Sequence, residues 1–349
     1  MWKRVNIEKI KVPSYKEYTL AVVKDSSQDT VKIKKIKDLH HLPIETLISA
    51  NKTFGIDDKF VNMVKTLYNT GFYIKTFQNT SVEKPIVVDY ITDEQNDTLI
   101  DYNIVEIEAN SSATVVFDYN SGAHGFHNGI TEVIAKEGAT VNIVKIQRLG
   151  NEFNDFDNNL VIVGKDATVN WSNVVIGAKM STFDVTVYLD EIGATFISKS
   201  IFLGVDSQKY DMAYKVYHQA PKSTSSVDLK GALKGSAEAT LIGNIDIKKG
   251  AKKAKAEENE TVLLLDKTVK SVAIPALYCG EDDVVAKHSA SAGQIDEDKL
   301  YYVMSRGFSF EEARLLMVQA ILNPVIDLIP YDPVKEIIIR GHIGRKIIK

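Results

Sequence analysis

The stretch CGEDDVVAKHSASAG, residues 279–293, gathers side chains that can bind metal ions or exchange protons. It holds the only cysteine of the chain, Cys279, a run of three acids from Glu281 to Asp283, and His288. A thiolate and an imidazole can ligate iron, and a carboxylate can orient the second nitrogen of the imidazole. The same residues would also suit a catalytic dyad, or an ordinary strand, turn and strand with polar ends. The elements around the stretch decide between these interpretations.

The composition of the 349-residue chain is that of a soluble protein, with 46 acids against 42 bases, and predicts no nucleic-acid surface. No apolar run approaches the roughly 18 residues that cross a bilayer, and the first residues, MWKRVNIEKIKV, lack an export signal. We therefore expect a cytoplasmic protein without membrane contact. Since there is one cysteine, a single chain can form neither an internal disulfide nor an all-cysteine cluster site.

A short phrase recurs through the middle of the chain and predicts a solenoid. Its alanines are Ala113, Ala139, Ala167 and Ala194, so the phrase returns at nearly even steps, and the intervals are rich in Val, Ile and Thr, as strands are. We expect a mainly β protein, a right-handed parallel β-helix, although the same phrase would also suit turns of an antiparallel sandwich. The copies are SSATVVF at 111, EGATVNI at 137, KDATVNW at 165 and IGATFIS at 192.

Three parts are expected along the chain. Residues 1–75 form an N-terminal mixed and helical segment, with a helix in DDKFVNMVKTLYNTG that closes at Gly71. Residues 76–293 form the β-helix core. Residues 294–349 form a C-terminal helical segment with a basic tail, VKEIIIRGHIGRKIIK, that could add an edge strand.

Two helices are predicted in the C-terminal segment. Asp296 can cap the first, and Gly307 ends it. Ser309 and Glu312 form a capping box at the start of the second, which the Asn-Pro pair at 323–324 stops. An apolar stripe on the second helix either packs within the chain or seats a partner, and Glu311, Arg314 and Gln319 are expected to face outward. The stripe consists of Phe310, Ala313, Leu316, Met317, Ala320 and Ile321.

At this point the sequence resembles the SufB/SufD family, the β-helical core subunits of the SUF iron–sulfur cluster assembly system. The resemblance covers roughly the last two-thirds of the chain, and its most specific part combines the acidic turn, the histidine, the small-residue run and the helix with MSRG. The phrases that carry it are NGITEVIAKEGATVNIVKIQ at 128–147, HQAPKSTSSVDLKGALKGSAEATLIGNIDIKKGA at 218–251 and the segment from ENETVLLL to QAIL at 258–322.

The resemblance implies a non-enzymatic scaffold that works as a homodimer or as a SufB/SufD-type heterodimer. It also implies a SufC-type ABC ATPase held by the C-terminal helices, and this chain has no phosphate-binding loop of its own. Iron or an iron–sulfur cluster would be held only transiently, with no permanent cofactor. We assign the ATPase contact to Tyr301, Met304, Arg306, Phe310, Arg314 and Met317.

The resemblance also points to site residues. His288 stands where the family keeps a histidine near the subunit interface, so we expect an iron or cluster ligand, with a satisfied structural histidine as the alternative. Asp282 or Asp283 would orient its second nitrogen. Glu260 occupies the position of the scaffold cysteine of SufB-type members, so the chain resembles either SufD or a stand-alone member of the family with altered cluster chemistry. Cys279 is a weaker ligand candidate, because its place in a strand favours a buried, inert thiol.

Other polar groups are given less weight. His124 and His127 form an H-x-x-H pair that could hold a metal on a helix, but the glycines around them favour a solvated loop. The competing functions are a carbohydrate-active β-helix enzyme that uses Asp282 and Asp283 as paired carboxylates, and a purely structural β-helix.

Overall fold

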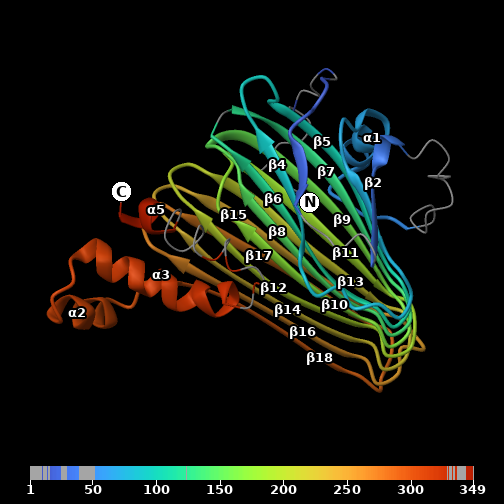
Figure 1. Ribbon diagram of the computed structural model, residues 1–349. Coiled ribbons are helices and arrows are strands. Elements are labelled where there is room, and N and C mark those ends of the chain that lie inside the picture. Colours follow the sequence, from blue (N-terminus) through green and yellow to red (C-terminus); the bar gives the residue numbers. More distant parts are fainter. Residues whose placement is uncertain are drawn as a thin grey trace.

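The computed structural model describes residues 10, 14, 16–24, 30–38, 52–122, 124–327, 329, 332, 335 and 343–348. Strand makes up 54% of the structure, and the strands wind around a common interior in a solenoid of about 8 turns (Figure 1). In the described residues the strands belong to two 9-stranded sheets, which we name A and B. The predicted β-helix is confirmed.

Consecutive strands from β3 onward alternate between the two sheets. Sheet A contains, in spatial order, β1 (Ala21–Lys24), β4 (Ile86–Thr92), β6 (Ser112–Ser121), β8 (Thr140–Arg148), β10 (Thr168–Val175), β12 (Thr195–Gly204), β14 (Thr224–Leu233), β16 (Lys255–Leu264) and β18 (Val285–Gln294). Sheet B contains β17 (Lys270–Cys279), β15 (Glu238–Ile247), β13 (Lys209–His218), β11 (Met180–Leu189), β9 (Glu152–Val163), β7 (His124–Ala135), β5 (Thr98–Ile107), β3 (Phe72–Thr76) and β2 (Val31–Lys35).

Pairing within each sheet is parallel except at its N-terminal edge. There β1 runs antiparallel to β4, and β2 runs antiparallel to β3. The opposite edges are β18 in sheet A and β17 in sheet B, so the last coil has no further coil stacked on it among the described residues. The two ends of the solenoid therefore differ: extra strands cover the first coil, and no described strand covers the last.

One corner of the solenoid explains the repeated phrase. The residue at this corner has positive φ in seven successive coils, a conformation that glycine, asparagine and aspartate adopt most readily. Its backbone N–H donates to a corner carbonyl of the next coil, as from Gly138 to Lys165. The corner residues are Asn79, Asn110, Gly138, Asp166, Gly193, Lys222 and Lys253.

This corner also corrects the first step of the repeat. Ser112 pairs with Thr140, and Thr140 pairs with Thr168, so these two coils have equal length. The structural equivalent of Ala139 is therefore Ser111, which follows the corner residue Asn110, and the shorter first step counted from Ala113 is wrong. The alanine of the copy at 111 lies two positions too late, because it is the next inward-facing residue of the strand.

Alternation along the strands divides the apolar side chains among an interior and two outer faces. The interior is a continuous cluster of valines, isoleucines and aromatic residues that runs through the coils. On the outer face of sheet B, helix α1 (Asp58–Leu67) buries Phe60 and Val64, and Asn128 donates its amide to the carbonyl of Phe60 at 2.9 Å. The Asp57 side chain caps α1, which confirms the helix predicted there.

Of the C-terminal helices that the structure describes (red in Figure 1), the last two pack on the outer face of sheet A, and the first packs against the second. They are α2 (Glu297–Ser305), α3 (Phe310–Ile326) and α5 (Gly344–Ile348). The caps at Asp296 and Ser309 are confirmed. The predicted stop at Asn323 and Pro324 is wrong: α3 continues to Ile326, because burial of Val325 and Ile326 against sheet A outweighs the hydrogen bond that proline cannot donate.

The face of α3 that packs against the sheet also differs from the predicted stripe. Val318 and Leu322 are fully buried, whereas Phe310 and Leu316 are exposed. Arg314, expected to face outward, is buried, because its guanidinium pairs with Asp266 of the β-helix. An ion pair with the body of the molecule therefore rotates the helix away from the orientation that apolar periodicity alone favours.

The basic tail is helical where it is described, so an edge strand is not formed by residues 344–348. Ile347 of α5 is buried in the same outer cluster as α3, and Lys234 donates to its carbonyl at 2.6 Å. Residues 336–342 and 349 of the tail lie outside the described residues. Among the residues that the structure describes, no helix has the length and apolar content required to span a membrane.

Candidate functional site

The interior of the last coil is open. Leu277 and Cys279 of β17 pair in register with Ile245 and Ile247, which are buried, yet Leu277 is 43% exposed and Cys279 is exposed as well. They face inward like their neighbours, but nothing in the described part of the chain covers them. We use the name terminal mouth for five inward-facing side chains of the last coil and of β16 that can bond a ligand or lie at the open end. They are Glu258, Glu260, Leu277, Cys279 and His288.

His288 lies in the terminal mouth directly opposite Glu258, since β16 and β18 pair Glu258 with His288. The His288 Nδ1 atom is 3.2 Å from Glu258 Oε2, and the His288 side chain is 18% exposed. Burial lowers the pKa of His288, so its imidazole is neutral at pH 7. The Nε2 atom is buried and has no hydrogen-bond partner among the described residues.

Glu258 and Glu260 are both buried carboxyl groups, 2% and 3% exposed. Burial, together with the neighbouring charge of Glu260, raises the pKa of Glu258 to about 8. Burial also raises the pKa of Glu260 to about 7. Glu258 is therefore largely protonated at neutral pH and can donate to His288 Nδ1. A bound cation would favour the carboxylate forms of both groups.

Gly243 of β15 provides the space for the Glu258 carboxyl group. A Cβ atom added at Gly243 would overlap the Glu258 carboxyl atoms, closer than non-bonded atoms approach. Glycine in the middle of a strand weakens the strand and commonly marks a site where another group comes close. The position of Glu258 thus depends on a residue from the opposite sheet.

The acids expected to orient His288 do not do so. Asp282 and Asp283 lie in the exposed turn before β18, where Lys253 donates its backbone N–H to the Asp283 carbonyl. The turn itself is as predicted, but the carboxylate opposite His288 comes from the preceding coil. Strand pairing, not proximity in sequence, supplies Glu258. An exposed turn also gives Asp282 and Asp283 no cleft in which to act as paired catalytic acids.

The placement of Cys279 corrects a second expectation. The side chain shares a strand face with Leu277 as predicted, but it is exposed because that face belongs to the open coil. Its Sγ donates to the Glu281 carbonyl at 3.2 Å. Within the described residues, no three acidic, histidine or cysteine side chains converge closely enough to hold a metal ion.

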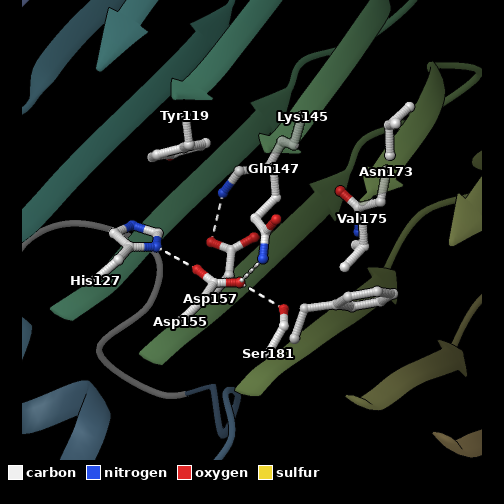
Figure 2. Close-up of a pocket in the computed structure, with 11 residues that line it drawn as sticks. Tyr119, His127, Lys145, Gln147, Asp155, Asp157, Asn173, Val175 and Ser181 are labelled. Carbon is white, nitrogen blue, oxygen red and sulfur yellow. Dashed lines mark hydrogen bonds and ion pairs between the residues drawn. The ribbon is translucent and has the colours of Figure 1, made fainter. Parts of the chain in front are cut away.

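A second histidine, His127, occupies the closed interior, and the solvated loop expected for it is wrong. It is 1% exposed and lies between the carboxylates of Asp101 and Asp155, and Figure 2 shows its contact with Asp155. Its Nδ1 atom is 2.5 Å from Asp155, and its Nε2 atom is 2.7 Å from Asp101. Burial alone would lower the pKa of His127, but the charges and hydrogen bonds of Asp101 and Asp155 raise it to about 10.

The polar groups around His127 are extensively hydrogen-bonded. Asp155 also accepts from Ser181 at 2.5 Å and from Gln147 at 3.1 Å. Beside them the buried Lys145 ammonium donates to Asp157 at 2.6 Å. These side chains line a cavity of about 20 Å³, room for one water molecule (Figure 2). The sequence carries a signal for this cluster, because Asp155 stands one full coil of the repeat after His127.

The six residues assigned to a partner fall on two sides of the helices. Tyr301 is 75% exposed, Met304 is exposed on the same helix, and Phe310 is exposed at the start of α3. Arg306 is exposed and stacks on the Tyr302 ring. Arg314 and Met317 instead face the β-helix: Arg314 bonds Asp266 and the Leu265 carbonyl, and Met317 packs against the outer cluster of sheet A.

Comparison with known proteins places these features in a family. A family model described as SUF system FeS cluster assembly, SufBD core domain, matches residues 90–321. The iron–sulfur cluster assembly protein SufD of Bacillus subtilis is 29% identical over 295 residues, 83% of this chain and 67% of that protein. The corresponding SufB is 24% identical over 79% of this chain and 60% of its own length. The matched part begins in β4 and ends in α3, so it includes the terminal mouth. The chain therefore belongs to the SufB/SufD family, which points to a role in iron–sulfur cluster assembly.

Proposed function

We propose that this chain is a non-enzymatic scaffold subunit of iron–sulfur cluster assembly, which dimerises through its last coil and associates with a SufC-type ABC ATPase through α2 and α3. Iron or a nascent cluster is its cargo, held at His288. The observation that carries the proposal is the terminal mouth: an open coil end that combines a neutral imidazole with two buried carboxyl groups but, within the described residues, has too few ligands to enclose a metal alone.

The exposed edge of the last coil supports dimerisation. β17 and β18 each lack a neighbour on one side in the described structure, and unpaired strand edges readily pair with another chain. Exposed apolar side chains accompany these edges, with Leu277 at 43%, Tyr278 at 60% and Val285 at 53%. A second copy, or a SufB-type paralogue, would cover these side chains and contribute the missing ligands.

The outer side of α2 and α3 supports an ATPase contact. The helices α2 and α3 and the turn between them expose Tyr301, Tyr302, Phe308 and Phe310, and aromatic residues contribute much of the binding energy in protein interfaces. The inner side of α3 is fixed to sheet A by Val318 and Leu322. α3 thus packs one face on the β-helix, and its other side, together with α2, would remain for a partner.

A physical link joins this partner face to the terminal mouth. Arg314 of α3 donates to Asp266 at 2.9 Å and to the Leu265 carbonyl at 3.1 Å. These two residues directly follow β16, the strand that carries Glu258 and Glu260. Movement of α3 by a nucleotide-driven partner would therefore pull on the strand that holds the carboxyl groups, and shift the last coil relative to the second subunit.

Co-expression of the full chain with a SufC-type ATPase tests the partner. We expect stable co-elution from the parent chain, and loss of co-elution from the Tyr301→Ala and Phe310→Ala variants. Phe77→Ala is the matched control, because Phe77 is 52% exposed at the other end of the molecule. Equal co-elution of all variants would remove α2 and α3 from the interface, and absence of co-elution from the parent would refute the ATPase association.

Reconstitution with iron and sulfide tests the cargo. The co-purified complex is expected to develop the visible absorption of a cluster, and His288→Ala is expected to abolish most of it. His124→Ala is the control, since His124 is an exposed histidine at the start of β7. Identical absorption from the His288 variant and the control would show that His288 is not a ligand.

A further inference from the structure

The cavity beside His127 has a polar lining in which one donor lacks a partner (Figure 2). The Asn173 side chain is 3% exposed and lines the cavity, and its Nδ2 atom has no hydrogen-bond partner among the described residues. The Tyr214 hydroxyl, which lies toward it, is already bonded to Ser198 at 2.9 Å and to Ser200 at 2.6 Å. Since an unpaired buried N–H destabilises a fold, Asn173 points to an acceptor that the described residues do not supply.

A carboxylate with free lone pairs also lines the cavity. Asp157 accepts from Lys145 at 2.6 Å and from Asn159 at 3.0 Å, whereas a carboxylate has about four lone-pair sites. The Lys145 ammonium has no hydrogen left to donate, because it also bonds Thr131 at 3.0 Å and Asn159 at 2.9 Å. The cavity therefore offers a free donor at Asn173 and a free acceptor at Asp157.

We propose that this cavity is a binding site for a single water molecule, which accepts from Asn173 Nδ2 and donates to the Asp157 carboxylate. The cavity volume of about 20 Å³ admits one water molecule. A buried water needs two to four polar partners, and these two groups supply them. The water is a fixed component of the closed interior, and the inference does not depend on the proposed iron cargo.

The charges around the cavity favour a neutral ligand over an ion. Three carboxylates lie around the cavity and the His127 ring, those of Asp101, Asp155 and Asp157. They outnumber the two cations, the Lys145 ammonium and the protonated His127 ring, so an anion would meet an excess of negative charge. A cation would face the unpaired N–H, and within the described residues no three acidic, histidine or cysteine side chains converge closely enough to hold a metal ion.

A crystal structure of the full-length chain, at a resolution that shows ordered water, tests occupancy directly. We expect one density peak in the cavity, about 2.7–3.2 Å from Asn173 Nδ2 and from a carboxylate oxygen of Asp157. An empty cavity would overturn the proposal. Crystals soaked in rubidium chloride or in sodium bromide test the ionic alternatives, because an anomalous signal at this position would place a cation or an anion there instead of water.

Val175→Ile tests in solution whether Asn173 holds a ligand. Val175 is an apolar residue of the cavity lining, and the added methyl group would displace the water and leave the Asn173 N–H unpaired. We expect the unfolding equilibrium constant, measured by urea denaturation, to rise about tenfold. Val187→Ile is the matched control, because Val187 is also buried in the interior but does not line the cavity.

The Asn173→Val variant completes a double-mutant cycle with Val175→Ile. It removes the unpaired N–H, so adding Val175→Ile to it is expected to raise the unfolding equilibrium constant by no more than about twofold. A rise of about tenfold in both backgrounds would overturn the role of Asn173, because Val175→Ile would then act by overpacking alone. A lower constant for Val175→Ile in the parent chain would show that the methyl group fills an empty cavity, and would also refute the bound water.

Discussion

The closed interior around His127 and the open terminal mouth around His288 use the same kind of residues with opposite results. Each histidine faces inward and contacts a carboxyl group from an adjacent coil. His127 has partners at both nitrogens, and its pKa is raised to about 10. His288 has a partner at one nitrogen, and its pKa is lowered by burial. The difference lies in what stacks above each coil.

This contrast separates polar groups that stabilise a fold from those that are available to a ligand. In the closed interior, coils on both sides supply Asp101 and Asp155, so a charged imidazole is fully compensated. In the last coil only one side is built within the described structure, and the atoms facing the open side stay unpaired. A buried polar group with complete partners is structural, and one with incomplete partners is a candidate binding site.

The largest expected effect comes from removing the closed histidine. His127→Ala leaves Asp101 and Asp155 buried without a counter-charge, which typically destabilises a protein by about 3–5 kcal/mol. His288→Ala is expected to change the free energy of unfolding by less than about 1 kcal/mol, because its partner Glu258 can remain protonated. Urea denaturation of both variants measures the difference. Similar losses for the two variants would break the comparison.

The pH dependence of stability provides a second test of the comparison between the two histidines. The folded-state pKa of His127 is about 10 against 6.5 for the free side chain, so its contribution is fully present below pH 6.5 and is lost as the pH rises through 10. The stability gap between the parent and His127→Gln is therefore expected to shrink steadily between pH 7 and pH 10. Denaturation midpoints at several pH values test this, and a constant gap would show that His127 is neutral in the fold.

A glycine tests how tightly the terminal mouth is built. Gly243→Ala introduces a Cβ where the Glu258 carboxyl group lies, and we expect a loss of about 1–3 kcal/mol from overpacking. Glu258→Ala in the same chain is expected to restore most of that loss. Gly293→Ala is the control, because nothing lies within 4 Å of its added Cβ. Failure of the second substitution to restore stability would mean that Gly243 serves the strand and not Glu258.

The smallest effect is expected at the cysteine. Cys279→Ser should change the free energy of unfolding by less than about 0.5 kcal/mol, as for other surface substitutions, because the thiol is exposed at the open end. Thermal and urea unfolding of the variant measure this. A loss above about 1 kcal/mol would show that Cys279 is packed as a core residue after all.

Much of the fold was predictable, because the responsible interactions repeat locally. The corner residues Gly138, Asp166 and Gly193 each precede an alanine and a β-branched strand, so the period appears in the letters. The caps at Asp296 and Ser309 are likewise local hydrogen bonds within the first helical turn. The orientation of α3 was not predictable in this way, since Arg314 is turned inward by Asp266, which is distant in sequence.

The candidate site shows the same limit more sharply. The resemblance selects His288 and Glu260, but neighbours in sequence suggest Asp282 and Asp283 as partners, and the structure provides Glu258 instead. The glycines around His127 likewise suggest a loop, although its partner Asp155 stands one coil later. In a solenoid, side chains that touch across neighbouring strands are separated by a whole coil of the chain. Motifs of closely spaced residues therefore do not identify which side chains are in contact.

By itself the sequence determined the class of fold, the rhythm of its coils, the two capped helices and the residue types at the terminal mouth, because alternation, turn chemistry and capping act over a few residues. Only the tertiary structure decided which of those residues meet and which remain open to solvent. Strand register brings Glu258 to His288, and the absence of a stacked coil among the described residues exposes Cys279. The register of the strands, and whether another coil covers the end of the solenoid, depend on the burial of whole coils. A short segment of sequence does not encode this burial.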